Sequence, residues 1–295
     1  MKYLEDAFKF LGKFFILIIP LFIASAIPSM IVGGTNTMEM TNRMNEFSVS
    51  MAEGSSDMLP QEIFGMLFEI LQPFFILVGI SLAVSLVLYL VVMPATYGMI
   101  NKALATGNAS LSDFLPELKN NFVKYILFGI CSFLVSIIIT IILAVIIALF
   151  VFLIIALQSV STTAMVLGIV IGVLIGIAII LLLMAFGFLL VYWFPAMVVD
   201  DLDVVAGFKK SIEVAKSYFW PTVGITLLIS IAGSVANSVL GFFGMVPVIG
   251  GIFISIVPTM ISFITTVFYI MVYRDKTGKN VSEEDNMPEL PGEYV

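Results

Sequence analysis

The sequence predicts an all-α, polytopic membrane protein with six transmembrane helices, amphipathic helices at the cytoplasmic interface, and both termini inside. Composition is the first reason, because 61% of the 295 residues are apolar and 11% are charged. Soluble domains are about 45–50% apolar and about 25% charged, so a soluble globule of this size could not hide so much apolar surface. The other two reasons are six long uncharged segments and the placement of the basic residues between them.

Six uncharged apolar segments are long enough to cross a bilayer, which takes about 20 residues in a helix. Their apolar residues are continuous rather than alternating, which excludes the strands of a membrane β-barrel. Backbone groups in lipid must be hydrogen-bonded within their own segment, and this leaves the helix. The segments cover residues 14–33, 73–99, 126–158, 165–199, 220–246 and 248–273.

The basic residues predict the orientation of these segments. Of the 13 lysines and arginines, all except Arg43 fall on one side of a path that crosses the membrane six times. Basic loops stay in the cytoplasm, so we expect both termini there. The expected location is the inner (plasma) membrane of a prokaryote.

The N-terminal segment has a second interpretation as a signal peptide. Three lysines precede the apolar residues 14–23, and small residues at 24–26 resemble a cleavage site. Glu5 and Asp6 dilute the basic region, however, and the apolar segment continues to Val32. These features favour a retained first span, with cleavage as the alternative.

Segments 126–158 and 165–199 are longer than the hydrocarbon layer requires. At 1.5 Å per residue, a helix of either length reaches roughly 50 Å. We expect these two spans to tilt strongly, to break, or to project together beyond the outer leaflet.

A polar stripe precedes the second segment. Glu62, Gly65, Glu69 and Gln72 are spaced three or four residues apart, which places them on one helix face opposite apolar residues. The pattern favours an amphipathic helix on the outer leaflet. The alternative places Glu69 at membrane depth, facing a vestibule, where an ionisable group is a functional candidate.

Three cytoplasmic segments follow one plan, a short amphipathic helix that leads into a membrane span. Their apolar residues recur every three or four positions with lysines between them, as in helices that lie at the inner headgroup level. We interpret residues 1–274 as one six-span domain with possible units 1–100, 109–200 and 203–274. The acidic tail 275–295 contains two prolines and is expected to be a disordered docking segment.

Two kinds of residue pattern inside the spans are candidates for packing or binding. Gly168, Gly172 and Gly176 clear one face of the fourth span, so that another helix can approach it closely. Serines and threonines recur along spans 3, 5 and 6, where they can bond their own i−4 carbonyl groups and pack as small residues. The functional alternative is a polar path for a substrate. Its candidate residues are Ser230, Ser234, Asn237, Thr259, Ser262 and Glu69.

Asn237 is the strongest hydrogen-bonding group of this path, because an amide in hydrocarbon needs a partner.

Charged and aromatic residues also gather at the cytoplasmic end of the fourth span. Asp200, Asp201 and Asp203 could hold a divalent cation through oxygen ligands. The simpler interpretation is that Asp203 caps the following helix. We expect an interfacial position for Asp200, Asp203, Lys209, Lys210 and Trp220, and an aromatic belt formed by Tyr192, Trp193, Tyr218, Phe219 and Trp220.

Several chemistries lack the residues that they need. The sequence has no histidine and a single cysteine, Cys131, which excludes a Cys/His metal site and a disulfide within the chain. No ionisable residue lies inside a span, with Glu69 as the borderline case, and there is no P-loop. We therefore expect a non-enzymatic protein without cofactor or metal. The net charge of −7, without a basic stripe, argues against nucleic acid as a partner.

The stretch Trp193–Asp200 (WFPAMVVD), followed by Gly207–Ser211 (GFKKS) and Tyr218–Pro221 (YFWP), forms a recurring pattern. It resembles the multi-pass membrane domain attached to some bacterial glycerophosphoryl diester phosphodiesterases, and related uncharacterised six-span families of bacteria and archaea. The resemblance covers roughly residues 90–230 and implies a free-standing helical membrane module. It does not imply the phosphodiesterase activity, since the chain lacks the histidines that such catalysis would use.

The leading functional interpretation is a membrane scaffold or accessory subunit that packs against lipids and against other membrane proteins or a second copy of itself. The glycine face, the interfacial helices and the lack of ionisable groups in the spans favour it. The alternative is a passive permease or a lipid-handling transporter, with a polar path lined by the serines and threonines of spans 3, 5 and 6.

Overall fold

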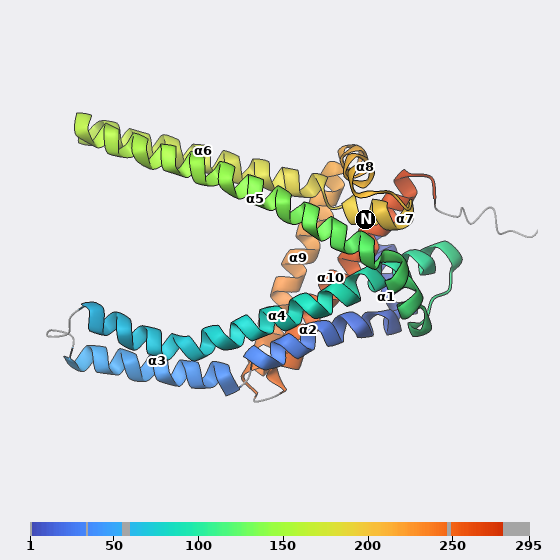
Figure 1. The fold of residues 1–295 in the computed structure, drawn as a ribbon, viewed down its shortest axis with the longest axis horizontal. Helices are drawn as coiled ribbons and strands as arrows, with labels where there is room; N and C mark the ends of the chain where they lie inside the picture. The colour runs from blue at the N-terminus through green and yellow to red at the C-terminus, as the bar shows by residue number, and fades with distance from the viewer. Residues whose placement is uncertain (1, 34, 55–59, 247–248, 280–295) are drawn as a thin grey trace, which may run out of the picture. The chain divides into compact units, whose positions relative to one another are not determined.

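The computed structural model describes residues 2–33, 35–54, 60–246 and 249–279, and all regular structure in these ranges is helical (Figure 1). Six stretches of the described residues are long and apolar enough to cross a membrane, which confirms the predicted number of helices of transmembrane length and composition. The helices are α1 (Lys2–Lys13), η1 (Phe15–Ile18), α2 (Ile19–Val32), α3 (Thr35–Gly54), α4 (Pro60–Thr106), η2 (Leu111–Asp113), α5 (Phe114–Val160), α6 (Thr162–Leu189), α7 (Trp193–Val199), α8 (Val204–Ser217), α9 (Phe219–Gly241), η3 (Phe242–Met245) and α10 (Gly250–Lys276).

The chain divides into two compact units. Unit 1 contains the described residues up to Phe122 and from Gly224 onward, and unit 2 contains Val123–Val223. This division does not test the predicted duplication into units 1–100, 109–200 and 203–274, which stays a prediction. Most of the predicted tail, from residue 280 onward, lies outside the described residues, and its first two residues complete α10.

Helix α10 is the centre of unit 1, and α1, α2 and α4 pack around it. Phe263, Val267, Phe268 and Ile270 of α10 are fully buried. The apolar face of α1 covers one side of this core, with the Phe10 ring centroid 6.3 Å from that of Phe263. Side-chain packing of this kind stabilises helix association in a membrane, where the hydrophobic effect between helices is weak.

Glycines allow α2 and α10 to meet backbone to backbone. A Cβ atom on Gly251 would lie 2.5 Å from the carbonyl oxygen of Ser29, and one on Gly33 would lie 3.2 Å from the Cα atom of Gly251. Real Cβ atoms essentially never come within 3.0 Å of another atom, so the crossing requires glycine at position 251.

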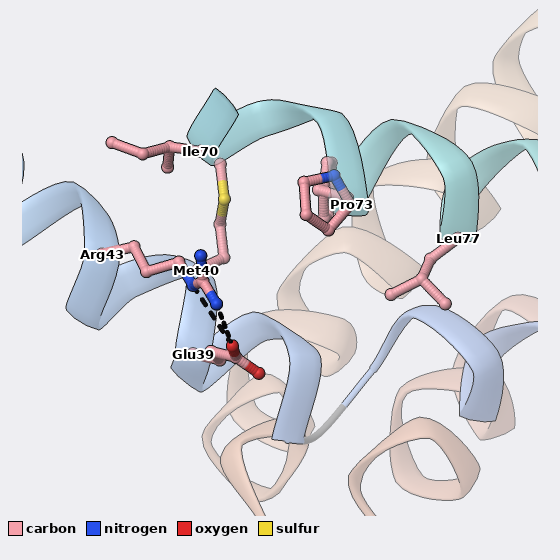
Figure 2. A pocket seen from close by; sticks show the side chains of 7 residues that line it. Glu39, Met40, Arg43, Ile70, Pro73 and Leu77 are labelled. Atoms are coloured by element: carbon pink, nitrogen blue, oxygen red, sulfur yellow. Dashed lines mark hydrogen bonds and ion pairs between the residues drawn. The ribbon is translucent and has the colours of Figure 1, made fainter. Parts of the chain in front are cut away.

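The segment between the first two spans contains a helix over residues 35–54. It forms α3, which packs against α4 (Figure 1). Residues 35–53 contain no proline or glycine, and the Arg43 guanidinium lies 2.8 Å from the Glu39 carboxylate one turn away. Figure 2 shows this ion pair beside Pro73 and Leu77 of α4, around a small hollow of about 60 Å³.

Helix α4 continues through Pro73 and Pro94 for 47 residues. The polar stripe before Pro73 is therefore the first part of a transmembrane-length helix, with α3 alongside. We expected a separate amphipathic helix there. A proline is compatible with a continuous helix in a membrane, because neighbouring groups can hydrogen-bond to the carbonyl that Pro73 leaves without its donor.

In unit 2, α5 and α6 form a long hairpin (Figure 1). Helix α5 is unbroken for 47 residues, about 70 Å at 1.5 Å per residue. The Ser161 side chain caps α6 by accepting a hydrogen bond of 3.0 Å from the Ala164 amide. We expected the two long spans to tilt, to break or to project beyond the outer leaflet. A break occurs only in the fourth span, where α6 ends at Leu189 and the short helix α7 follows.

Helix α8 packs on α6 and α7 through specific contacts. The Trp193 indole N–H donates to the Val204 carbonyl oxygen at 2.8 Å, and the Ser211 hydroxyl donates to that of Leu189 at 2.8 Å. A Cβ atom on Gly207 would lie 2.8 Å from Met197. These contacts fix α8 beside the end of α6.

The predicted aromatic belt is wrong for two of its members. Tyr192 and Trp193 are 0% and 3% exposed, and the Tyr192 hydroxyl lies 2.6 Å from that of Thr222. The rings of Phe128 and Phe208 pack against that of Trp193 within unit 2. The amphipathic character of tyrosine and tryptophan suits an interface, but here their polar atoms find partners inside the protein.

All three segments predicted as cytoplasmic amphipathic helices are helical. The first and third are the separate helices α1 and α8, which end before Phe14 and Tyr218. The second begins with a capping box between Ser110 and Asp113 and continues without a break into α5.

Candidate functional site: a polar groove between α9, α10 and α4

The serines and threonines of the fifth and sixth spans meet along a groove in unit 1. Its volume is about 560 Å³, and α9 and α10 supply most of its walls, with two side chains from α4. The lining residues are Met93, Tyr97, Thr226, Ser230, Gly233, Ser234, Asn237, Pro258, Ile261, Ser262, Thr265, Thr266 and Tyr269.

Four of the six residues predicted for the polar path line this groove: Ser230, Ser234, Asn237 and Ser262. The other two lie elsewhere. Thr259 is buried, and its hydroxyl donates to the Ser255 carbonyl oxygen at 2.7 Å. Glu69 lies exposed on the first half of α4.

Some hydroxyl groups of the groove already donate their hydrogen to their own helix. The Ser234 hydroxyl donates to the Ser230 carbonyl oxygen at 2.9 Å, and that of Thr266 to Ser262 at 2.8 Å. Such a hydroxyl can offer a ligand only its oxygen lone pairs. These side chains therefore act as hydrogen-bond acceptors toward the groove.

Asn237 adds a stronger acceptor to the same wall. Its Oδ1 atom is buried and has no hydrogen-bond partner among the described residues. A buried polar atom without a partner costs about 1–3 kcal/mol. A donor on a ligand pairs with this oxygen when the amide turns toward the groove, which the Asn237 side chain lines.

Electrostatically, the groove is neutral, since none of its lining residues is charged. Tyr97 and Tyr269, which the sequence interpretation missed, contribute two phenol groups, and the Tyr269 hydroxyl lies 3.2 Å from that of Thr226. Spacing could have revealed Tyr269, because residues 262, 265, 266 and 269 share one face of α10. Tyr97 comes from α4, and nothing local to its sequence links it to α9.

The serines of the third span line a different groove, within unit 2. Ser132 and Ser136 face Gly187 and Trp193 across a volume of about 280 Å³. The Ser136 hydroxyl donates to the Ser132 carbonyl oxygen at 2.9 Å. The serines of the third span therefore belong to unit 2, and they do not line the groove between α9, α10 and α4.

The glycine face of α6 is largely covered by α5. A Cβ atom on Gly172 would lie 1.7 Å from the Phe150 ring, and one on Gly168 would lie 2.5 Å from Leu157. A Cβ atom on Gly176 would meet nothing within 4 Å. The glycines make room for large α5 side chains, and only Gly176 is left open.

The charged residues near α8 have separate partners. Asp203 caps α8 by accepting a hydrogen bond of 2.8 Å from the Ala206 amide, which confirms the predicted N-cap. Asp201 has a positive φ of 56° and pairs with Lys124 at 2.5 Å. The hydrogen bond and the charge of that ammonium lower the pKa of Asp201.

The other predicted interfacial residues lie near the same helix. Lys210 pairs with Glu213 at 2.8 Å, whereas Lys209 is exposed and Trp220 is 78% exposed. Asp200 is the C-cap of α7. Among the described residues, no three histidine, cysteine, aspartate or glutamate side chains come together as a metal site.

The helices and the neutral groove define a polytopic helical membrane protein. Residues 58–275, which include α4 to α10 almost entirely, match the family described as "Domain of unknown function (DUF7847)". The match covers more than half of the chain, so the protein belongs to this family. Comparison with curated proteins and with solved structures finds no match.

Proposed function

We propose that this membrane protein is a lipid-handling protein or passive permease that holds the polar part of its substrate in the groove between α9, α10 and α4. The unpartnered, buried Oδ1 atom of Asn237 is the observation that carries the proposal. If the amide served only a contact between helices, an apolar side chain of similar size would make the folded protein more stable.

The chemistry of the groove favours a neutral substrate that donates hydrogen bonds. Asn237, Ser234 and Thr266 present acceptors, and no lining residue supplies a positive charge for a phosphate or carboxylate. The hydroxyl groups of a sugar or polyol fit these acceptors. Met93 and Ile261 supply apolar surface for the rest of an amphiphile.

Lipid analysis of the purified protein tests this function. Wild type and Asn237→Leu are extracted in a mild detergent, and the retained lipids are identified by native mass spectrometry. We expect wild type to retain a hydroxyl-rich lipid or solute that Asn237→Leu loses. Ser238→Ala is the control. Ser238 follows Asn237 on α9 and its hydroxyl donates to the Ser234 carbonyl oxygen, but it does not line the groove. Equal retention by all three proteins would contradict the proposal.

We place both termini in the cytoplasm, in the inner membrane of a prokaryote. The positions of the basic residues support this, and contacts in unit 1 agree with it. The Tyr3 hydroxyl donates to the Asp275 carboxylate, and the Arg274 guanidinium donates to Asn101 Oδ1 at 2.8 Å. The start of α1 and the ends of α4 and α10 therefore lie together. Helices α1 and α8 are proposed to lie at the inner headgroup level, where Lys209 can meet anionic lipid.

A scaffold role is the second candidate, and the exposed outer faces of the α5–α6 hairpin favour it. Gly176 remains open on this hairpin, with exposed Ile175 and Ile177 beside it. A partner membrane protein or a second copy could pack there. Both candidate functions are non-enzymatic.

A further inference from the structure

Helix α4 is longer than a membrane is thick. Its apolar stretch from Ile63 to Thr106 has 44 residues, which at 1.5 Å per residue extend over about 66 Å. A bilayer with its headgroups is roughly 40–45 Å thick, and transmembrane helices tilt by about 0–40°. At the largest tilt the helix still rises roughly 50 Å along the membrane normal. One end of α4 therefore projects into water.

Ion pairs beside α4 indicate which end projects. Charged groups are costly inside hydrocarbon, so each pair marks a membrane surface. Lys102, near the end of α4, pairs with Asp113 at 2.6 Å. The pair of Glu39 and Arg43 lies beside Pro73 (Figure 2). Pro73 and Lys102 are about 44 Å apart along the helix, close to the thickness of a bilayer. The part of α4 before Pro73 is therefore the end in water.

A row of apolar side chains runs along one face of α4, from this projecting end into the membrane-spanning part. Phe64 and Phe68 are 71% and 55% exposed, although no lipid can cover them there. The spacing along the row alternates between four and three residues, which is the heptad pattern of a coiled coil. This row, the α4 seam, consists of the exposed Phe64, Phe68, Phe75 and Leu82 and the half-buried Leu71 and Val78.

We propose that the α4 seam joins two copies of this chain in a parallel coiled coil. Both copies cross the membrane in the same orientation, so a two-fold axis along the membrane normal brings equivalent heptad positions together. None of the six seam residues is charged, so equivalent residues meet without repulsion. Glu69 and Gln72 are exposed beside the seam and stay in water. The inference does not depend on the function proposed for the groove.

The size of the seam suits a dimer. A phenylalanine buries roughly 150–250 Å² and a leucine side chain roughly 60–120 Å². At their present exposure, the four exposed side chains would bury roughly 300–550 Å² per copy. Leu71 and Val78 add to this area, and specific interfaces begin at about 600 Å² per partner. Lipid could cover the seam only from Phe75 onward, whereas a second α4 covers its whole length.

Cysteine cross-linking in the membrane tests this contact. Cys131→Ser first removes the native thiol, and a single cysteine is then introduced as Phe68→Cys or Leu82→Cys, two heptads apart on the seam. Glu69→Cys is the matched control, because Glu69 is also exposed in water but points about 100° away from Phe68. After mild oxidation of intact membranes, we expect at least tenfold more cross-linked dimer from each seam variant than from the control. Equal yields from all three variants would overturn the proposal.

The mass of the purified full-length protein gives an independent test. Light scattering, corrected for bound detergent, is expected to show twice the mass of one chain for wild type. Phe64→Glu combined with Phe68→Glu places like charges in the seam and should give single chains. Their unfolding midpoint should not change, because both side chains are exposed in one copy. Val49→Glu is the control, since Val49 is 55% exposed on α3, outside the seam. A monomeric wild type, or a dimer that persists with both glutamates, would overturn the proposal.

Discussion

The hydroxyl groups of Thr226 and Tyr269 lie 3.2 Å apart and join α9 to α10 at the substrate groove. Further along the same two helices, a Cβ atom on Gly233 would lie 1.9 Å from the Ile261 side chain. Asn237 follows one turn later with its unpartnered oxygen. One pair of helices thus combines a polar contact, an apolar contact and an unsatisfied acceptor along a single face.

Replacing Asn237 should improve stability while it removes function. In Asn237→Leu the buried, unpartnered oxygen is lost, so we expect the ligand-free protein to become about 1 kcal/mol more stable. Chemical or thermal unfolding after delipidation measures this change. Glu69→Leu, on the exposed face of α4, should leave lipid retention unchanged. A strongly destabilised Asn237→Leu would mean that the amide is structural.

The crossing of α2 and α10 should not tolerate a side chain at Gly251. The added methyl group of Gly251→Ala would meet the Ser29 carbonyl oxygen at 2.5 Å, and the helices would have to separate. We expect a loss of about 1–3 kcal/mol in the free energy of unfolding. Gly79→Ala is the control, because nothing lies within 4 Å of its Cβ position. Equal stability of the two variants would rule out this close contact.

Two positions on the glycine face of α6, Gly172 and Gly176, should respond differently to a large side chain. Gly172→Leu would displace the Phe150 ring, and we expect a loss of about 1–3 kcal/mol in stability. Gly176→Leu has open space and should fold normally. Unfolding of the two purified proteins measures the difference. Loss of a co-purifying partner only in Gly176→Leu would instead support the scaffold function.

The ion pair between Asp201 and Lys124 should make a small, pH-dependent contribution to stability. Because the folded protein lowers the pKa of Asp201, the carboxylate stabilises the fold above its unfolded pKa of about 4. That stabilisation is lost as the pH falls through the lower, folded pKa. Asp201→Asn keeps a residue that accepts positive φ but removes the charge.

We therefore expect wild type to be slightly more stable than Asp201→Asn at pH 7, with the difference shrinking as the pH falls through the lowered pKa of Asp201. Unfolding midpoints of both proteins across this range give the comparison. A difference that grows toward acid pH would contradict the sign of the pKa shift.

The sequence predicted the elements of this fold better than their contacts. The six spans follow from hydropathy, and Asp203 as an N-cap follows from local residue preference. The serines of α9 and α10 were identified from helical spacing alone. Each of these depends on interactions within one segment, and a single sequence carries that information directly.

Contacts between segments were harder to predict, since apolar residues face both lipid and protein in a membrane helix. Hydropathy therefore did not separate buried Trp193 from exposed Trp220. The meeting of Gly33 and Gly251 joins residues far apart in the chain, and no local pattern indicates it.

The most direct test of the substrate groove compares two ligands, one of which lacks the hydrogen-bond donors of the other. Native mass spectrometry would measure binding of a monoglucosyl diacylglycerol and of its fully O-methylated analogue to wild type and Asn237→Leu. The account predicts that wild type prefers the free-hydroxyl lipid at least tenfold and that the variant loses this preference. Equal binding of both lipids to wild type would contradict it.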